Sequence, residues 1–330
     1  MRIKFSIYPR TDVITLQDGL KRAIVFEEAG FDAIWEADHY LPEVHTGGHV
    51  SDVTVMLEEY LNHTRKIVVG PMVVCPIGFR SQPGDIALRY AIMASLHPGR
   101  VALCAGAGCA AVEKTSTGMF PPTKERRARL EEAIRLIREC WTSDDYVAFN
   151  GRYFNTLFFL YDKPETPIPI YLAASGPKSA RLAGRLADGF VGLGSPEYFK
   201  EKLIPEFERG VADQNRNLSN AEKMVFIPVS YNQDRRAAYD IPRRMYGYLY
   251  LYYDTDIDPR IMEQKSSTVG DDLIEKEFCI ATSSEALIER FDKYVKAGVN
   301  HIVCYDVSDD PSTNLAKIFK DEVFPYFRQN

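Results

Sequence analysis

A carboxylic acid and an imidazole stand side by side after one apolar run. Asp38 and His39 end the run in DAIWEADHYLPEVH, and Glu43 and His45 follow shortly after. A neighbouring carboxylate can orient an imidazole and set its tautomer, which suits His39 to proton transfer. The alternative is a hydrogen-bonded loop histidine without a catalytic task. A metal site that also includes His49 is a third interpretation, but its irregular spacing does not match zinc motifs, so we expect no metal.

A pair of glycines follows a second apolar run in VALCAGAGCA. Gly106 and Gly108 would let the backbone approach a planar ligand or a phosphate closely. Cys109 comes next, and an ordinary thiol with a pKa of about 8.5 is mostly protonated at neutral pH. Cys109 is therefore a candidate proton donor or a packing residue. A tight turn after a strand is the structural alternative for the glycines.

Small residues precede the start of a helix in YLAASGPKSARLAGR. Pro177 suits the first turn of a helix. We expect the N–H groups of Gly176, Lys178 and Ser179 to point toward an anion, which predicts phosphate binding. The alternative gives Ser175 only the structural task of capping this helix.

A third run, KIVVGPMVVCPIGFR, forms an apolar wall before Cys75. Such a wall suits the face of an aromatic ring, although it also suits ordinary packing between strands.

The elements that must position these residues repeat along the chain. A helix-ending glycine or turn is followed at once by a β-prone run, which is an αβ junction. These junctions occupy residues 29–38, 97–108, 183–194 and 297–307, and further strands are expected at 2–8, 66–74, 167–173 and 223–229. Apolar residues at helical spacing predict helices around 124–141, 283–297 and 312–328.

Together these strands supply the eight of a TIM (β/α)8 barrel, whose active site lies at the carboxyl ends of the strands. The 330 residues exceed the roughly 250 of a typical barrel. We expect loop insertions around 109–166 and 232–272 within one domain spanning 1–330. Asn150-Gly151 is a hairpin signal in the first insertion. The tyrosines at 246, 248, 250, 252 and 253 in the second are expected on a helix or oligomer surface, with a substrate pocket as the alternative. An open doubly wound sheet is the alternative, which the absence of GxGxxG after the first strand disfavours.

Composition excludes several classes of protein. Lys and Arg number 40 against 46 Asp and Glu, for a net charge of −6, so we expect no nucleic-acid partner. No apolar run reaches the roughly 20 residues of a membrane helix, and the start lacks a signal peptide, which predicts a cytoplasmic protein. The 6 cysteines include no CxxC pair and are expected to be reduced thiols.

Several motifs carry a family resemblance. AIWEADHY, VGPMVVCPIGFR, PGRVALCAGAG, VAFNGRYFN and PIYLAASGPKSARLAGRLADGF resemble the luciferase-like superfamily, in its branch that uses coenzyme F420, a deazaflavin. The resemblance extends over nearly the whole chain in the family's order. It implies a TIM barrel with an insertion, a homodimer, and an oxidoreductase that transfers a hydride between deazaflavin C5 and a small organic substrate or a one-carbon pterin carrier. An FMN-dependent monooxygenase and an inactive cofactor-binding relative are the alternatives.

The resemblance also implies roles for individual residues. Asp38 would contact the deazaflavin, and His39 would be the acid/base. Met72-Val73 matches a non-prolyl cis peptide in a bulge behind the ring. Other implied cofactor contacts are Cys75, Ala107 and Gly108 at the ring and ribityl chain, and Ser175, Gly176, Lys178 and Ser179 at the phosphate.

The sequence departs from the branch at several positions. Glu43 stands where its sugar and alcohol dehydrogenases carry a tryptophan, and Cys109 where they carry an acidic proton donor. We expect the carboxylate function to have moved to Glu43; a solvated rim position for Glu43, with Cys109 as the donor, is the rival interpretation. Leu193 and Pro196 replace the phosphate contacts of the sugar-phosphate enzyme, which disfavours that substrate, and Ser6 replaces a glutamate of the pterin reductase.

Overall fold

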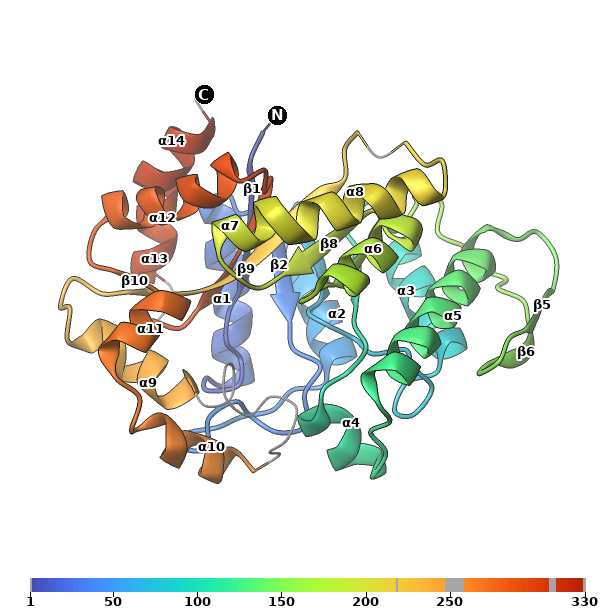
Figure 1. The fold of residues 1–330 in the computed structure, drawn as a ribbon, viewed down its shortest axis with the longest axis horizontal. Helices are drawn as coiled ribbons and strands as arrows, with labels where there is room; N and C mark the ends of the chain where they lie inside the picture. The colour runs from blue at the N-terminus through green and yellow to red at the C-terminus, as the bar shows by residue number, and fades with distance from the viewer. Residues whose placement is uncertain (1, 218, 247–257, 309–312, 329–330) are drawn as a thin grey trace.

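Parallel strands follow one another around a closed barrel in the computed structural model, which describes residues 2–217, 219–246, 258–308 and 313–328 (Figure 1). The order in the sheet is β3-β2-β1-β11-β9-β8-β7-β4. Isolated parallel bridges from Val69 to Val101 and from Val74 to Ala105 join β3 to β4 and complete the circle. The barrel strands are β1 (Lys4–Tyr8), β2 (Ala33–Glu36), β3 (Val68–Pro71), β4 (Leu103–Ala105), β7 (Ile170–Ala173), β8 (Gly189–Gly192), β9 (Glu222–Tyr231) and β11 (His301–Asp306). The predicted TIM barrel is confirmed, and the open sheet is wrong.

Helices cover the outside of the barrel, and buried apolar positions explain where they form. Leu130, Ile134 and Ile137 are buried on one face of the long helix α5, at the spacing used to predict it. The covering helices are α1 (Leu16–Ala29), α2 (Val53–His63), α3 (Pro83–Leu96), α4 (Ala110–Thr117), α5 (Thr123–Thr142), α6 (Pro177–Leu186), α7 (Pro196–Tyr198), α8 (Ile204–Asp213), α12 (Ser284–Lys296), α13 (Thr313–Ile318) and α14 (Phe324–Arg328). Within the described ranges, no helix is long and apolar enough to cross a membrane.

The two predicted insertions add elements to the barrel. The first contains α4, α5 and an antiparallel hairpin of β5 (Val147–Asn150) and β6 (Asn155–Phe158), whose turn follows Asn150 as predicted. The second contains α9 (Asp240–Tyr246), α10 (Pro259–Ser266) and the start of α11 (Asp271–Glu277), after which β10 (Cys279–Ala281) pairs with the end of β9. Residues 247–257, with most of the tyrosine cluster, lie outside the described residues. Tyr246 is buried and stacks on Phe278, so the surface prediction is wrong for this tyrosine.

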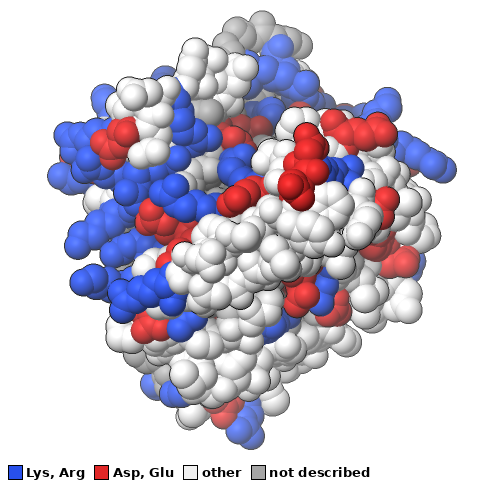
Figure 2. All heavy atoms as spheres, turned by 90° about the vertical axis from the view of Figure 1, so that its right-hand side faces the viewer, with Lys and Arg blue, Asp and Glu red and all other residues white. Residues whose placement is uncertain are grey.

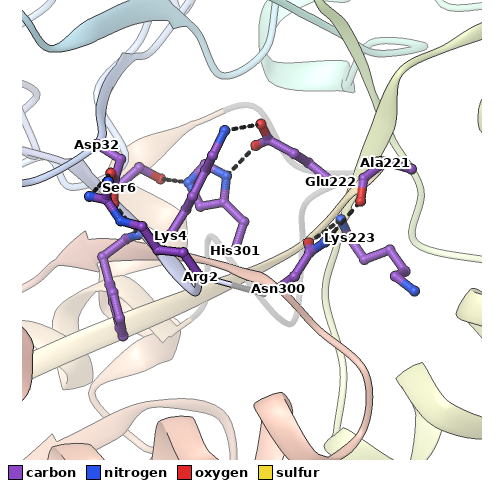
Figure 3. Close-up of polar contacts among 10 residues, drawn as sticks. Arg2, Lys4, Ser6, Asp32, Ala221, Glu222, Lys223, Asn300 and His301 are labelled. Atoms are coloured by element: carbon purple, nitrogen blue, oxygen red, sulfur yellow. Dashed lines mark hydrogen bonds and ion pairs between the residues drawn. The ribbon is translucent and has the colours of Figure 1, made fainter. Parts of the chain in front are cut away.

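Polar side chains fill the barrel near the amino ends of its strands (Figure 3). His301 Nδ1 lies 2.5 Å from Glu222 Oε2, and its Nε2 lies 2.9 Å from Ser6 Oγ. Lys4 Nζ lies 2.5 Å from the other oxygen of Glu222, and Trp35 Nε1 donates to Ser6 Oγ at 2.8 Å. Because catalytic groups of TIM barrels lie at the opposite end, we assign this network to fold stability.

Candidate active site

Asp38 and His39 follow β2 directly, at the carboxyl end of the barrel. Arg80, from the loop after β3, places Nη2 2.5 Å from Asp38 Oδ1, and its Nη1 donates to the Asp38 carbonyl at 2.9 Å. The Arg80 guanidinium also lies 4.2 Å from the centre of the Tyr40 ring. Burial raises the pKa of Asp38, and the charge of Arg80 opposes that shift. The ion pair therefore favours an ionised Asp38 in a buried position.

The imidazole of His39 is neutral near pH 7. Burial first, and the charge of Arg80 second, lower its pKa to about 4. A neutral imidazole near pH 7 is able to accept a proton from a substrate hydroxyl. Nδ1 of His39 lies 3.7 Å from Glu43 Oε1, slightly beyond hydrogen-bond length.

Glu43 lies inside the protein and not on a solvated rim. Its residue surface is 4% exposed, so the rim interpretation is wrong. Tyr305 Oη donates to Glu43 Oε2, and the Glu43 N–H donates to Asp12 Oδ2 at 3.2 Å. Burial, and then the nearby Asp12, raise the pKa of Glu43 well above its ordinary value, whereas Tyr305 and Arg10 oppose the shift.

Asp12 and Tyr305 are site residues that the sequence analysis missed. Tyr305 belongs to β11, the last barrel strand, and Asp12 follows β1, the first. The two strands pair in parallel, with Tyr8 opposite Tyr305, which brings both side chains to Glu43. The strand-end rule would have identified both if it had been applied to every strand.

The predicted apolar wall lies between the ends of β3 and β4. The Met72-Val73 peptide bond is cis, as the resemblance implied. The Gly106 N–H donates to the Val74 carbonyl at 2.9 Å. A Cβ at Gly106 would lie 2.6 Å from Val73 Cγ2, so this close approach requires glycine. Cys75 is buried beside the wall, and burial raises its pKa well above the ordinary value, which keeps the thiol protonated.

A buried carboxyl that the sequence analysis also missed follows the glycine pair. Gly108 has φ +81, and Glu113 Cγ lies 2.7 Å from where its Cβ would be. Glu113 is 0% exposed. Burial raises its pKa to about 7, against the charge of Arg80. Its position four residues after Cys109 in a helix was the available signal.

Cys109 and Ala107 occupy different surroundings within this loop. Cys109 is the N-cap residue of α4 and packs with Ala111, Val112 and Met262 in a small apolar cluster. The carbonyl of Ala107 accepts a hydrogen bond from Arg126 Nε at 3.1 Å. The role of Cys109 as a proton donor stays a prediction.

The predicted phosphate loop precedes α6. Gly176 is the N-cap residue and no side chain caps the helix, so the interpretation of Ser175 as a structural cap is wrong. The Ser179 N–H donates to the Gly176 carbonyl at 3.0 Å, so the expectation that this amide faces an anion is also wrong. A Cβ at Gly176 would meet nothing within 4 Å, and Lys178 is exposed. Gly176 and Lys178, with the side chains of Ser175 and Ser179, therefore remain the candidate phosphate contacts.

Glu36 and His45, two further polar residues of this segment, have structural and surface positions. Glu36 accepts hydrogen bonds from Tyr60 Oη at 2.6 Å and Ser51 Oγ at 3.1 Å, and a third from Thr11, which anchors the loops around it. His45 is exposed. Among the residues that the structure describes, no group of three or more His, Cys, Asp or Glu side chains could hold a metal ion.

The loops after β2, β3 and β4 thus meet around the Arg80–Asp38 pair, with an apolar wall and a neutral imidazole. Residues 2–301 match the model of the luciferase-like monooxygenase family. The chain belongs to this family. Within the luciferase-like monooxygenase family it is 35% identical over 316 residues to an F420-dependent glucose-6-phosphate dehydrogenase of Rhodococcus erythropolis, covering 93% of this chain and 92% of the relative. The enzyme of the same name from Kribbella flavida is 33% identical over 336 residues, covering 100% and 99%.

Two solved structures are similar in fold. An F420-dependent secondary alcohol dehydrogenase in complex with an F420-acetone adduct has a TM-score of 0.92 and 29% identity, covering 97% of this chain and 98% of that chain. A coenzyme F420-dependent tetrahydromethanopterin reductase from Methanopyrus kandleri has a TM-score of 0.78 and 20% identity, covering 99% and 100%. The second likeness shows the fold alone.

Proposed function

We propose that the protein is a coenzyme F420-dependent oxidoreductase that interconverts a small alcohol and its carbonyl compound. The observation that carries the proposal is the neutral His39 at the end of β2, beside the Asp38–Arg80 pair and the apolar wall of Met72 and Val73. The TM-score of 0.92 to the secondary alcohol dehydrogenase supports the same class of substrate.

The site has the features that a deazaflavin needs. The wall at Met72 and Val73 offers an apolar surface to a ring, and Gly106 and Gly108 allow close approach of the backbone. The open space at Gly176 suits the phosphate end. Asp38, Cys75, Ala107, Ser175 and Lys178 complete the proposed contacts, with Ser179 offering its hydroxyl group. When bound, the deazaflavin supplies the hydride acceptor or donor at C5.

The chain's own groups orient the substrate and handle one proton. His39 would accept the hydroxyl proton during oxidation of an alcohol and return it during reduction of a carbonyl. Buried loops around His39 and Glu43 would exclude water and hold the reacting carbon in place.

Glucose 6-phosphate is not the substrate that we propose. The loop after β8 presents Leu193 and Pro196, where the resemblance places polar phosphate contacts. Neither side chain can donate a hydrogen bond or supply a positive charge to a phosphate dianion. A pterin carrier is also less favoured, because Ser6 is occupied by hydrogen bonds with Trp35 and His301 inside the barrel.

Equilibrium titration with F420 and FMN, followed by assays on short secondary alcohols, tests the proposal. We expect tighter binding of F420 than of FMN, and F420 reduction with alcohols but not with glucose 6-phosphate. Preferential FMN binding would favour the monooxygenase alternative. Binding of F420 without turnover on any alcohol or carbonyl would favour an inactive relative.

We also propose that the protein forms a homodimer through α3 and the β5–β6 hairpin. Leu88 and Leu96 of α3 are 46% and 66% exposed, and Leu157 of the hairpin is 67% exposed. The two elements are adjacent, because Phe158 lies 3.6 Å from the Cβ position of Gly84. Figure 2 faces this side of the molecule and shows a broad area with few charged side chains. Such an area is typical of an interface between protein chains.

Light scattering after size-exclusion chromatography tests the dimer. Leu96→Glu and Leu157→Glu should give monomers, whereas Tyr326→Glu, on the exposed side of the last helix α14, should not. A monomeric wild-type protein would contradict this proposal without affecting the proposed chemistry.

A further inference from the structure

Glu43 lies between an imidazole and a second carboxyl group. Its Oε1 lies 3.7 Å from His39 Nδ1, and its Oε2 accepts the hydroxyl hydrogen bond of Tyr305. The Glu43 N–H donates to Asp12 Oδ2 at 3.2 Å. Asp12 is 8% exposed, Glu43 4% and Tyr305 0%, so water does not screen the charges of this group effectively.

We propose that the ionised Glu43 accepts the Nδ1 proton of His39 during turnover and later returns it, while Asp12 and Tyr305 set the proton affinity of Glu43. Glu43 would then be the proton store of the imidazole that meets the substrate. This inference rests on the proposed function, in which His39 handles the substrate proton. Asp12 and Tyr305 are positioning residues that act through Glu43.

The surroundings of Glu43 balance its two protonation states. Two neighbouring buried carboxyl groups do not readily ionise together, so Asp12 favours the protonated form of Glu43. The Tyr305 hydroxyl and the Arg10 guanidinium favour the ionised form. Both oxygens of Glu43 are thus used: Oε2 is held by Tyr305, and Oε1 is directed toward the imidazole.

Other charges near this group act on its neighbours. Burial raises the pKa of Asp12, and the charges of Arg10 and then Arg244 oppose that shift. The ring of Tyr8 packs edge-on against that of Tyr305, with centroids 4.6 Å apart, which fixes the phenol in place. Burial raises the pKa of Tyr305 well above its ordinary value, so it remains a hydrogen-bond donor.

The relay moves protons only. When Nε2 of His39 accepts the proton of a substrate hydroxyl, the proton on Nδ1 crosses to Oε1 of the ionised Glu43, which becomes a neutral carboxylic acid. The reverse transfer restores the starting state during reduction of a carbonyl. The 3.7 Å separation must shorten for this transfer, as catalytic contacts commonly do when substrate binds.

The first test uses the protein without cofactor. Infrared spectroscopy follows the carbonyl band of protonated Glu43 as a function of pH, and the band is assigned by its loss in Glu43→Gln. Asp12→Asn should lower the titration midpoint by about 1 to 3 pH units, because it removes a neighbouring negative charge. Tyr305→Phe should raise the midpoint by roughly one unit, because it removes a donor to the ionised form.

Opposite shifts in these two variants would support the proposed effects of Asp12 and Tyr305 on Glu43, and Asp18→Asn on the surface of α1 should leave the midpoint unchanged. Shifts in the same direction, or no shift in either variant, would overturn the proposal. Because no cofactor is involved, this result is independent of whether the enzyme uses F420.

The second test measures kcat/KM against pH with F420 and an alcohol. The limb of the kcat/KM profile that reflects ionisation of Glu43 should move to lower pH in Asp12→Asn and to higher pH in Tyr305→Phe. If the limbs stay in place although the infrared midpoints move, the relay is wrong and the proposed function stands. If Cys109→Ala removes the limb and Glu43→Gln does not, the thiol is the proton carrier and the relay is also wrong.

Discussion

Arg80 and Asp38 join two loops of the candidate site. The guanidinium of Arg80 contacts both the carboxylate and the backbone carbonyl of Asp38, with Nη2 2.5 Å from Oδ1 and Nη1 2.9 Å from the carbonyl oxygen. The contact holds the loop after β3 against the end of β2. It also places a fixed positive charge beside His39, whose pKa it helps to lower.

Arg80→Met should therefore lower the free energy of unfolding and raise the pKa of His39. Removing one partner of a buried ion pair leaves Asp38 buried without its cation, which costs about 3 kcal/mol or more of unfolding free energy. The pKa of His39 should rise, because one of the two causes that lower it is removed. Urea unfolding measures the first effect, and NMR titration of the imidazole measures the second. Arg80→Lys keeps the charge and should preserve more of both properties; an unchanged His39 pKa in Arg80→Met would contradict the electrostatic account.

His39→Ala should lower turnover by roughly 10²- to 10⁴-fold, the usual effect of losing an acid/base group. Affinity for F420 should stay close to that of the wild type, because the proposed cofactor contacts lie on other residues. Steady-state kinetics on a confirmed substrate and equilibrium titration of F420 measure the two quantities. Turnover near the wild-type value would show that His39 is structural and that the proton uses another route.

The sequence was sufficient for the barrel but not for all of its active site. Junctions between helix and strand repeat along the chain, so each barrel strand could be located from local patterns. Asp38 and His39 were found because they end a strand. The burial of Glu43 depends on Tyr305, which is 262 residues away, and no local pattern records that contact. Glu113 was missed because its burial depends on the fold of the Gly108 loop around it.

The loop before α6, proposed to bind phosphate, shows a second limit of prediction from sequence. The sequence correctly located a helix start at Pro177. It did not distinguish Ser175 from Gly176 as the N-cap residue, because serine and glycine both occur at that position. The identity of the N-cap residue decides which backbone amides can bind an anion. The Ser179 amide instead donates to the Gly176 carbonyl within the first helix turn.

Glu222→Gln should destabilise the protein in a pH-dependent way. Burial alone would raise the pKa of Glu222, but His301 and Lys4 lower it to about 2 from an ordinary 4.5. Because its pKa is lower in the folded protein, the ionised Glu222 stabilises the fold above pH 4.5, and this stabilisation is lost as the pH falls through 2. At pH 7 the variant should lose about 3 kcal/mol, since each pKa unit corresponds to about 1.4 kcal/mol.

Thermal or urea unfolding at pH 7 and pH 3.5 measures this effect, and the loss should be smaller at the lower pH. Glu289→Gln is the matched control, because the Glu289 side chain is 74% exposed in its ion pair with Lys293. Such a surface pair contributes little. An equal loss for Glu222→Gln at both pH values would contradict the ionic role of Glu222.

Glu113→Gln should have the opposite effect on stability. Burial raises the pKa of Glu113 from 4.5 to about 7, so its contribution is fully present below pH 4.5 and is lost as the pH rises through 7. At pH 8 the wild type must keep an ionised carboxyl buried, whereas the amide of the variant carries no charge. The variant should therefore gain stability relative to the wild type as the pH increases from 4.5 to 8, by up to about 3 kcal/mol.

Urea unfolding of the wild type and Glu113→Gln at intervals across this range measures the difference. Glu59→Gln, on the exposed side of α2, is the control and should show no such trend. A difference that does not change with pH would mean that Glu113 ionises normally in the folded protein. A buried carboxyl that titrates near neutral pH is costly to keep, and the helix turn after Gly108 places it beside the residues proposed to hold the cofactor. The predicted gain in stability on its removal would therefore mark Glu113 as a residue retained for function at the expense of stability.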